Sequence, residues 1–237
     1  MYQNSVISIQ HLNYYFGRGS LRKQALFDVN LSINCGEIII LTGPSGSGKT
    51  TLLSLIAGLR SVQEGSIKVL EQELYRISNQ NLLHLRRKIG YVFQKHNLVP
   101  FLTASQNVQM TLEVCKNLSK KEMRSRSAAI LELVGLQQRL DYYPEQLSEG
   151  QKQRVAFARA LVTQPQLILA DEPTASLDKK STNSVVEILK DFVKHQNSSV
   201  LLITHDNRIL DIADRIIYME DGHLKNEVRD VSNNRIN

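Results

Sequence analysis

The sequence contains few of the residues that stabilise small secreted or metal-dependent domains. Its 237 residues include only 2 cysteines. These two, Cys35 and Cys115, are too few for a disulfide framework and have no metal-ligand spacing, which indicates a reducing compartment. The N-terminus has no basic segment followed by an apolar run, so no signal peptide is expected. A disulfide-rich scaffold and a cysteine metal site are therefore excluded.

Long apolar runs are also absent. The longest are "IIIL" at 38–41, "LILA" at 167–170 and "VLLI" at 200–203, far below the roughly 18 residues that a membrane-spanning helix needs. The content of 42% hydrophobic and 22% charged residues is typical of globular proteins and excludes a disordered class. The mild net charge of +6 fits nucleic acid or an anionic membrane surface, but about as often it reflects only solubility. We expect a soluble chain with a substantial core.

The short apolar runs predict the fold class. Runs rich in leucine and β-branched residues, each followed by Gly, Asp or His, are typical of strands buried on both faces of a parallel sheet. Helical patterns follow at 49–59 and 178–196. The second has one apolar stripe, formed by Val185, Ile188, Leu189 and Phe192. Alternating strands and helices predict an α/β domain with a parallel sheet.

Two further regions have different patterns. Segments 6–16 and 23–33 alternate like antiparallel strands, and the pattern between Thr103 and Val162 is almost wholly helical. A helix is expected over 120–136, with one side formed by Met123, Ser127, Ile130 and Val134. Because no flexible linker is present, we expect a single domain over 1–237. It would comprise an N-terminal antiparallel β subdomain and a helical subdomain, at about 95–162, inserted in the α/β core.

The stretch "GPSGSGKTT" predicts a phosphate-binding loop. It matches G-x-x-x-x-G-K-[ST], in which loop amides point at a phosphate chain and a helix starts immediately behind. Lys49 would reach the β- and γ-phosphates, and the Thr50 hydroxyl would bind Mg²⁺. The alternative is a plain glycine-rich turn, but the stretch lies between a buried-strand pattern and a helical one, as the motif requires. The predicted nucleotide-binding residues are Gly43, Pro44, Ser45, Gly46, Ser47, Gly48, Lys49, Thr50 and Thr51.

Two carboxylates follow the second buried run, in "QLILADEP". Asp171 is expected to bind Mg²⁺, and Glu172 to orient the attacking water or accept its proton. His205 follows the third run and is expected to bridge the γ-phosphate and the catalytic carboxylate. A lone histidine there would usually be a surface residue, so its role depends on the other parts of the site.

Six motifs in a fixed order resemble the ATP-binding subunit of ATP-binding cassette (ABC) transporters, over about residues 5 to 226. They are Walker A at 43–50, "YVFQ" ending in Gln94, the signature "LSEGQ" at 147–151, Walker B at 167–172, "SLD" at 176–178, and His205. The resemblance implies a P-loop NTPase core of the RecA-like type. It also implies an ATPase that uses ATP and Mg²⁺, with Lys49, Gln94, Glu172 and His205 in catalysis.

The resemblance further implies that each nucleotide site is shared by two copies in a homodimer. ATP would lie between Walker A of one copy and the signature turn of the other. Ser148 and the amides of Gly150 and Gln151 would bind the γ-phosphate, helped by the dipole of a helix expected at 151–162. Asp178 would face the other copy. Glu149 replaces the usual glycine of the family, and its side chain is expected to point outward to solvent.

Two other roles come from the same resemblance. Gln94 would bind Mg²⁺, together with Thr50 and Asp171, and would link the attacking water to rotation of the helical subdomain. An aromatic ring upstream of the loop would stack on adenine; Phe16 is expected in that role, with Tyr15 as the alternative.

Within the family, the segments at 16–33 and 93–108 resemble the MacB and LolD class, and most of all the DevA-like ATPases of heterocyst glycolipid export. This implies an exporter in which dimer closure transmits force to a separate membrane permease. The cargo would be lipid, glycolipid or lipoprotein. A membrane-fusion protein is expected in the complex, at the cytoplasmic face of the inner membrane, and no nucleic acid.

Two alternatives do not involve transport. An ABC ATPase acting on ribosomes or DNA is disfavoured, because this chain has one intact cassette and no heptad array. A cell-division regulator of similar length, which controls a periplasmic partner without cargo, is poorly separated by sequence.

Overall fold

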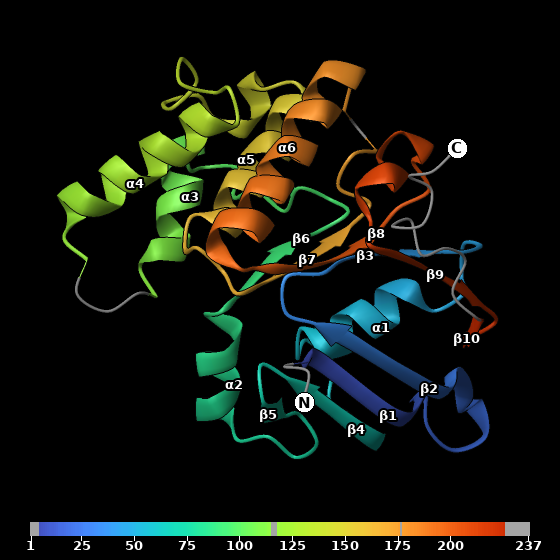
Figure 1. Ribbon diagram of the computed structural model, residues 1–237. Helices are drawn as coiled ribbons and strands as arrows, with labels where there is room; N and C mark the ends of the chain where they lie inside the picture. Colours follow the sequence, from blue (N-terminus) through green and yellow to red (C-terminus); the bar gives the residue numbers. More distant parts are fainter. Residues whose placement is uncertain (1–4, 115–117, 176, 226–237) are drawn as a thin grey trace.

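A six-stranded sheet forms the middle layer of the computed structural model, which describes residues 5–114, 118–175 and 177–225 (Figure 1). Its strand order is β10 (His223–Lys225), β9 (Arg215–Glu220), β3 (Ile38–Thr42), β8 (Ser199–Ile203), β7 (Leu167–Asp171) and β6 (Ile89–Val92). All neighbours are parallel except β9 and β10. The carboxyl ends of β3, β7 and β8 therefore meet at one edge, where ligands bind in such sheets.

Each central strand is buried on both faces. In β7, Ile168 and Ala170 belong to one hydrophobic cluster, whereas Leu167 and Leu169 belong to another. This two-sided burial is why the strands are continuous apolar runs in the sequence.

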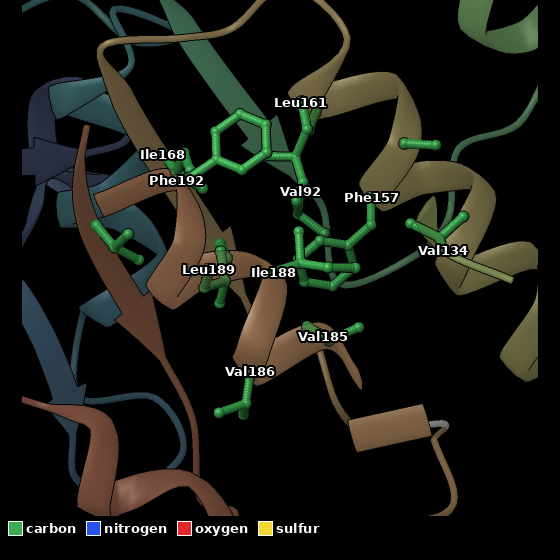
Figure 2. Packing of buried hydrophobic residues seen from close by; sticks show 14 of the residues in the cluster. Val92, Val134, Phe157, Leu161, Ile168, Val185, Val186, Ile188, Leu189 and Phe192 are labelled. Carbon is green, nitrogen blue, oxygen red and sulfur yellow. The ribbon is translucent and has the colours of Figure 1, made fainter. Parts of the chain in front are cut away.

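Helices cover one face of this sheet (Figure 1): α3 (Ala104–Leu112), α4 (Lys120–Leu133), α5 (Glu149–Leu161) and α6 (Lys179–Gln196). The four predicted stripe residues of α6 are buried. Figure 2 shows them gathered with Val92 of β6 and Phe157 of α5. The helices of segment 104–161 thus share one hydrophobic cluster with α6 and the sheet.

The other face packs on α1 (Lys49–Ile56), which separates the central sheet from a second, antiparallel sheet (Figure 1). The order of that sheet is β2 (Lys23–Asn34), β1 (Ser5–Phe16), β4 (Glu64–Val69) and β5 (Gln72–Glu73). The remaining elements are α2 (Asn79–Arg86) and the 3₁₀ turns η1 (Gly19–Leu21), η2 (Pro144–Gln146) and η3 (Asn207–Ile212). The predicted fold class, an α/β core with antiparallel and helical additions, is confirmed.

Several boundaries differ from the sequence-based expectation. The helix expected at 151–162 begins at Glu149, because Ser148 and Gln151 form a capping box. The Gln151 amide donates to Ser148 Oγ at 3.3 Å, and the Ser148 amide donates to Gln151 Oε1 at 2.9 Å. Helices α1 and α4 end three residues earlier than their patterns suggested, and α2, β4 and β5 were not expected.

The cysteines, the "SLD" sequence and the short apolar runs can also be compared with the structure. Cys35 is exposed and free, whereas Cys115 lies outside the described residues, as does Ser176 of the "SLD" sequence. Within the described ranges, no helix combines the length and apolarity needed to cross a membrane.

Candidate nucleotide site

A cavity of about 840 Å³ opens at the carboxyl edge of the six-stranded sheet. Its volume lies within the usual range for small-molecule sites. The predicted residues that line it are Phe16, Ser45, Gly46, Gly48, Lys49, Thr50, Thr51, Gln94, Asp171, Glu172 and His205. Residues from five distant parts of the sequence therefore meet in one site.

The Walker A loop joins β3 to α1 and has a tightly determined shape. Gly43 has φ +137°, and a Cβ there would overlap the Met219 carbonyl. Gly46 has φ +82° with nothing within 4 Å of an added Cβ, so the backbone is open on the side where the cavity lies. The Gly222 amide donates to the Ser47 carbonyl at 3.0 Å and braces the loop from the β9–β10 turn. Gly43, Pro44 and Ser47 shape the loop without lining the cavity.

Lys49 is only 7% exposed and lies folded against its own loop. Its Nζ donates to the carbonyls of Gly43 at 2.6 Å and Pro44 at 2.7 Å. Burial lowers the pKa of Lys49, while the nearby carboxylates of Glu172 and Asp171 oppose that shift. The loop therefore presents a partly desolvated cation to the cavity, as recognition of phosphate requires.

Asp171 and Thr50 are close together at the floor of the cavity. Burial raises the pKa of Asp171, and a hydrogen bond with the Thr50 side chain lowers it in part. Among the described residues there is no group of three or more His, Cys, Asp or Glu that could hold a metal ion. Mg²⁺ does not need one, because it binds through one or two protein oxygens, water and substrate phosphates. Thr50 and Asp171, with Gln94 in the same cavity wall, fit such an ion.

Glu172 has an uncommon backbone conformation for a side-chain-bearing residue, with φ +49°. Its amide donates to the Ile203 carbonyl at 2.9 Å, which ties it to the neighbouring strand. Its Oε1 lies 3.4 Å from Nε2 of His205. Burial raises the pKa of Glu172, while His205 lowers it. A carboxylate with a raised pKa in contact with a histidine is suited to take a proton from water.

Phe16 and not Tyr15 lines the cavity. Phe16 is 39% exposed, and the Arg60 guanidinium lies 5.0 Å from its ring centroid. The Tyr15 ring is instead covered by Arg22, at 3.7 Å. Phe16 therefore presents an exposed aromatic ring to the cavity, the surface on which a base stacks.

Sequence analysis missed part of the cavity wall. The missed residues are Lys23, Gln24, Ala25 and Phe27 of β2, Ala175, Ile203, and Asp221 and Gly222 of the β9–β10 turn. The pairing of the two predicted N-terminal strands could have indicated the β2 residues, because Phe16 of β1 pairs with Lys23 of β2.

The signature turn does not contribute to this cavity. Ser148, Gly150 and Gln151 do not line it, nor does Asp178. The Asp178 carboxylate instead accepts the Ser181 amide at 2.7 Å and caps α6. Glu149 is directed along its own helix, where its Oε1 accepts from Lys152 Nζ at 2.6 Å. One chain therefore contains a Walker site and a separate capped turn.

Comparison with known proteins gives a consistent result. The family model described as ABC transporter matches residues 26–175. A Staphylococcus haemolyticus protein, HrtA, named as a hemin import ATP-binding protein, is 39% identical over 219 residues, covering 92% of this chain and 99% of that protein. HrtA of Staphylococcus epidermidis strain ATCC 12228 is also 39% identical over 219 residues, 92% of this chain and 98% of that protein.

Solved structures show the same fold. A dimeric post-hydrolysis state of the ATP-binding cassette MJ0796, bound to ADP and Pi, superposes with a TM-score of 0.90 at 36% identity, covering 94% of this chain and 98% of that one. Clostridium perfringens CbiO1, part of the ABC transporter complex CbiONQ, has a TM-score of 0.81 at 29% identity over 94% of this chain and 88% of that one.

Proposed function

This chain belongs to the ABC transporter family, and from that premise we propose that it drives a separate membrane permease by ATP-dependent closure of a homodimer. It is an ATPase that uses ATP with Mg²⁺. The single observation that supports dimer closure is the split site: the Walker residues share one cavity, and the capped turn at Ser148 lies outside it.

We assign the chemical steps to residues of this chain. Lys49 and the loop amides bind the phosphate chain, and Phe16 stacks on the base. Glu172 orients water and takes its proton, and His205 holds Glu172 and contacts the γ-phosphate. Thr50, Asp171 and Gln94 would hold Mg²⁺, which supplies charge neutralisation to the phosphates.

The signature turn then acts on the nucleotide of the other copy. In α5 the amide of Gln151 is already bonded to Ser148 Oγ. No hydrogen bond involves the amides of Glu149 and Gly150 within the described part of the chain. These amides, with the Ser148 hydroxyl, form an anion-binding helix N-terminus. We propose that they bind the γ-phosphate in trans, with the Glu149 amide in the place expected for the Gln151 amide, which donates to Ser148 Oγ. We also propose that Asp178 contacts the same interface.

ATP-dependent dimerisation of the Glu172→Gln chain tests this division of the site. Lys49→Ala should abolish both nucleotide binding and dimer formation. Ser148→Arg should retain nucleotide binding and lose the dimer, because its site lies in the partner. Ser184→Arg, an exposed position on α6, is the matched control and should still dimerise. If Ser148→Arg lost nucleotide binding as a monomer, the signature turn would belong to the site of its own chain.

A groove beside the Gln94 segment, with Phe93 and Asn97 in its wall, is the proposed permease contact. It has a volume of about 440 Å³ and lies between α2, β6, α3 and α5. Its wall includes the exposed apolar side chains of Leu83, Met110 and Val114, and Arg87 lies at its basic rim. This composition fits an amphipathic helical segment with acidic residues. We propose that a permease segment of that kind docks here, on the cytoplasmic face of the membrane.

The direction of transport and the cargo are a separate proposal. The segments at 16–33 and 93–108 support an exporter of the MacB and LolD class, with a DevA-like lipid or glycolipid cargo and a membrane-fusion protein. The relatives described above are instead named for hemin import. We retain export as the direction and propose an amphipathic cargo, with hemin as the competing candidate.

A strain lacking the chain distinguishes these candidates. Growth in hemin should leave internal hemin raised if hemin is exported, lowered if it is imported, and unchanged if the cargo is a lipid. The Glu172→Gln chain with ATP should co-purify with a permease from native membranes, and a membrane-fusion protein beside it would support the DevA-like assignment. A non-transport ATPase, such as a cell-division regulator, would leave every cargo level unchanged.

A further inference from the structure

A second cavity lies beside the segment that follows Gln94. It has a volume of about 520 Å³, and its wall consists of Gln94, Lys95, His96, Asn97, Leu98, Pro144, Glu145, Glu149 and Lys152. Gln94 also lines the nucleotide cavity. This residue therefore stands between the nucleotide site and a region built from the first turn of α5.

Helix α5 contacts the segment behind Gln94 at both of its ends. Near its C-terminal end, the Arg159 guanidinium donates to the carbonyls of Asn97 at 2.6 Å and His96 at 2.8 Å. In its first turn, Glu149 Oε2 lies 3.6 Å from His96 Nδ1, and Glu149 Oε1 accepts from Lys152 at 2.6 Å. The C-terminal end of α5 thus contacts the backbone of residues 96 and 97, and its first turn contacts the His96 side chain.

The contact in the first turn of α5 involves the His96 side chain, which has few other polar partners. The His96 side chain is 16% exposed, and its Nε2 is buried with no hydrogen-bond partner among residues 5–114, 118–175 and 177–225. The Nδ1 edge therefore faces the Glu149 carboxylate at 3.6 Å. Burial lowers the pKa of His96, and the nearby Glu149 opposes that shift, so the contact is one between the ring edge and a carboxylate. Lys152 fixes the Glu149 carboxylate in that position. A residue without a carboxylate at position 149 would leave His96 without this contact.

We propose that Glu149 is a positioning residue for ATP hydrolysis, because it holds the segment behind Gln94 against the turn that contains Ser148. Gln94 and Ser148, which act on different nucleotides, then move as one body. The proposal rests on the function proposed above, in which Gln94 binds at the Walker site and Ser148 acts on the other copy.

A double-mutant cycle on the full-length chain tests this coupling. Glu149→Gln and His96→Gln should each lower kcat about 3- to 10-fold and change KM for ATP by less than about twofold. The double variant should be no slower than the slower single variant, because both changes remove one contact. Glu187→Gln is the matched control: Glu187 pairs with Lys190 at 3.1 Å with the same i,i+3 spacing on α6, and its kcat should be unchanged. Multiplicative losses in the double variant, or no loss in either single variant, would overturn the proposal.

Amide hydrogen exchange gives a readout that does not require hydrolysis. Without nucleotide, amides of residues 95–98 should exchange about tenfold faster in Glu149→Gln than in the parent chain or in Glu187→Gln. Unchanged exchange would overturn the proposal even in an active enzyme. If the parent chain failed to hydrolyse ATP, the proposed function would fall, while the exchange experiment would still decide whether Glu149 holds this segment.

Discussion

Glu172 combines a left-handed backbone conformation, partial burial and a histidine neighbour in one residue. Glu172→Gln keeps the shape of the side chain and removes its basicity. We expect kcat to fall about 10²- to 10⁴-fold, because general-base catalysis contributes factors of that size. ATP binding and ATP-dependent dimer formation should persist. Phosphate release and nucleotide binding, measured on the same preparation, check this. Near-normal turnover would assign the base to another residue.

The Glu172 carboxylate should also determine how ATPase activity falls at acid pH. The base must be deprotonated to act, and burial raises the pKa of Glu172 above its ordinary value of 4.5. Activity should therefore decline, as the pH falls, at a higher pH than an exposed glutamate would give. His205 lowers that pKa, so His205→Gln should move the decline to still higher pH. Profiles of kcat/KM, which report the groups of the free enzyme, test this for the two proteins. An unmoved acid limb in His205→Gln would contradict it.

At the scale of elements, hydrophobic periodicity predicted the buried strands and the buried face of α6. It did not predict where α5 begins, because a capping box determines that residue. The stripe of α6 and the runs at 38–41, 167–170 and 200–203 depend on burial, which hydrophobic spacing records directly. The start of α5 depends on a capping box between Ser148 and Gln151. The same residues matched a phosphate-binding turn, so the helix was expected two residues too late.

Ser148 caps a helix and is also proposed to bind phosphate, and a second capping serine allows the two roles to be separated. Ser148 caps α5 and Ser119 caps α4, each in a capping box. Ser148→Ala and Ser119→Ala should each lower the free energy of unfolding by about 1 kcal/mol. Only Ser148→Ala should also weaken ATP-dependent dimerisation, which would be measured on a Glu172→Gln background. Equal dimerisation by the two variants would restrict Ser148 to a structural role.

The neighbouring residue gives a further prediction for the first turn of α5. The Glu149 side chain is 64% exposed and its carboxylate is paired with Lys152, so it adds little repulsion to a phosphate bound at the turn. Glu149→Gly should change the ATP concentration for half-maximal dimer formation by less than about tenfold. Titration of dimerisation with ATP checks this value. A larger gain in apparent affinity would mean that the carboxylate faces the nucleotide.

At the scale of the whole molecule, the sequence predicted the site residues that lie in motifs at the ends of strands. It did not predict the residues that reach the cavity because the two sheets pack together. Asp171 ends β7, and Lys49 and His205 come after β3 and β8, so motif and strand order place them together. Phe27 and Gly222 enter the cavity wall because the Phe27 amide donates to the Gly222 carbonyl at 3.0 Å, which joins β2 to the β9–β10 turn. No local pattern records that contact.

The proposed permease groove is also a property of the whole molecule, because it lies where α2, β6, α3 and α5 meet. Met110 is 38% exposed in that groove. Met110→Asp would place an unpaired charge where an apolar helix is expected to bind, and such a charge is costly to desolvate. We expect recovery of the permease with the Glu172→Gln chain to fall at least about tenfold, equivalent to about 1.4 kcal/mol of binding free energy.

Two comparisons make the result of that experiment specific. ATP-dependent dimerisation of the Met110→Asp chain should be unchanged, because the groove is separate from Walker A and the signature turn. Leu133→Asp, at a 51% exposed apolar position on α4 outside the groove, should retain the permease. Loss in both variants would point to a general effect of added charge on this part of the molecule. Retention in both would place the permease elsewhere on the surface and leave the groove without its proposed occupant.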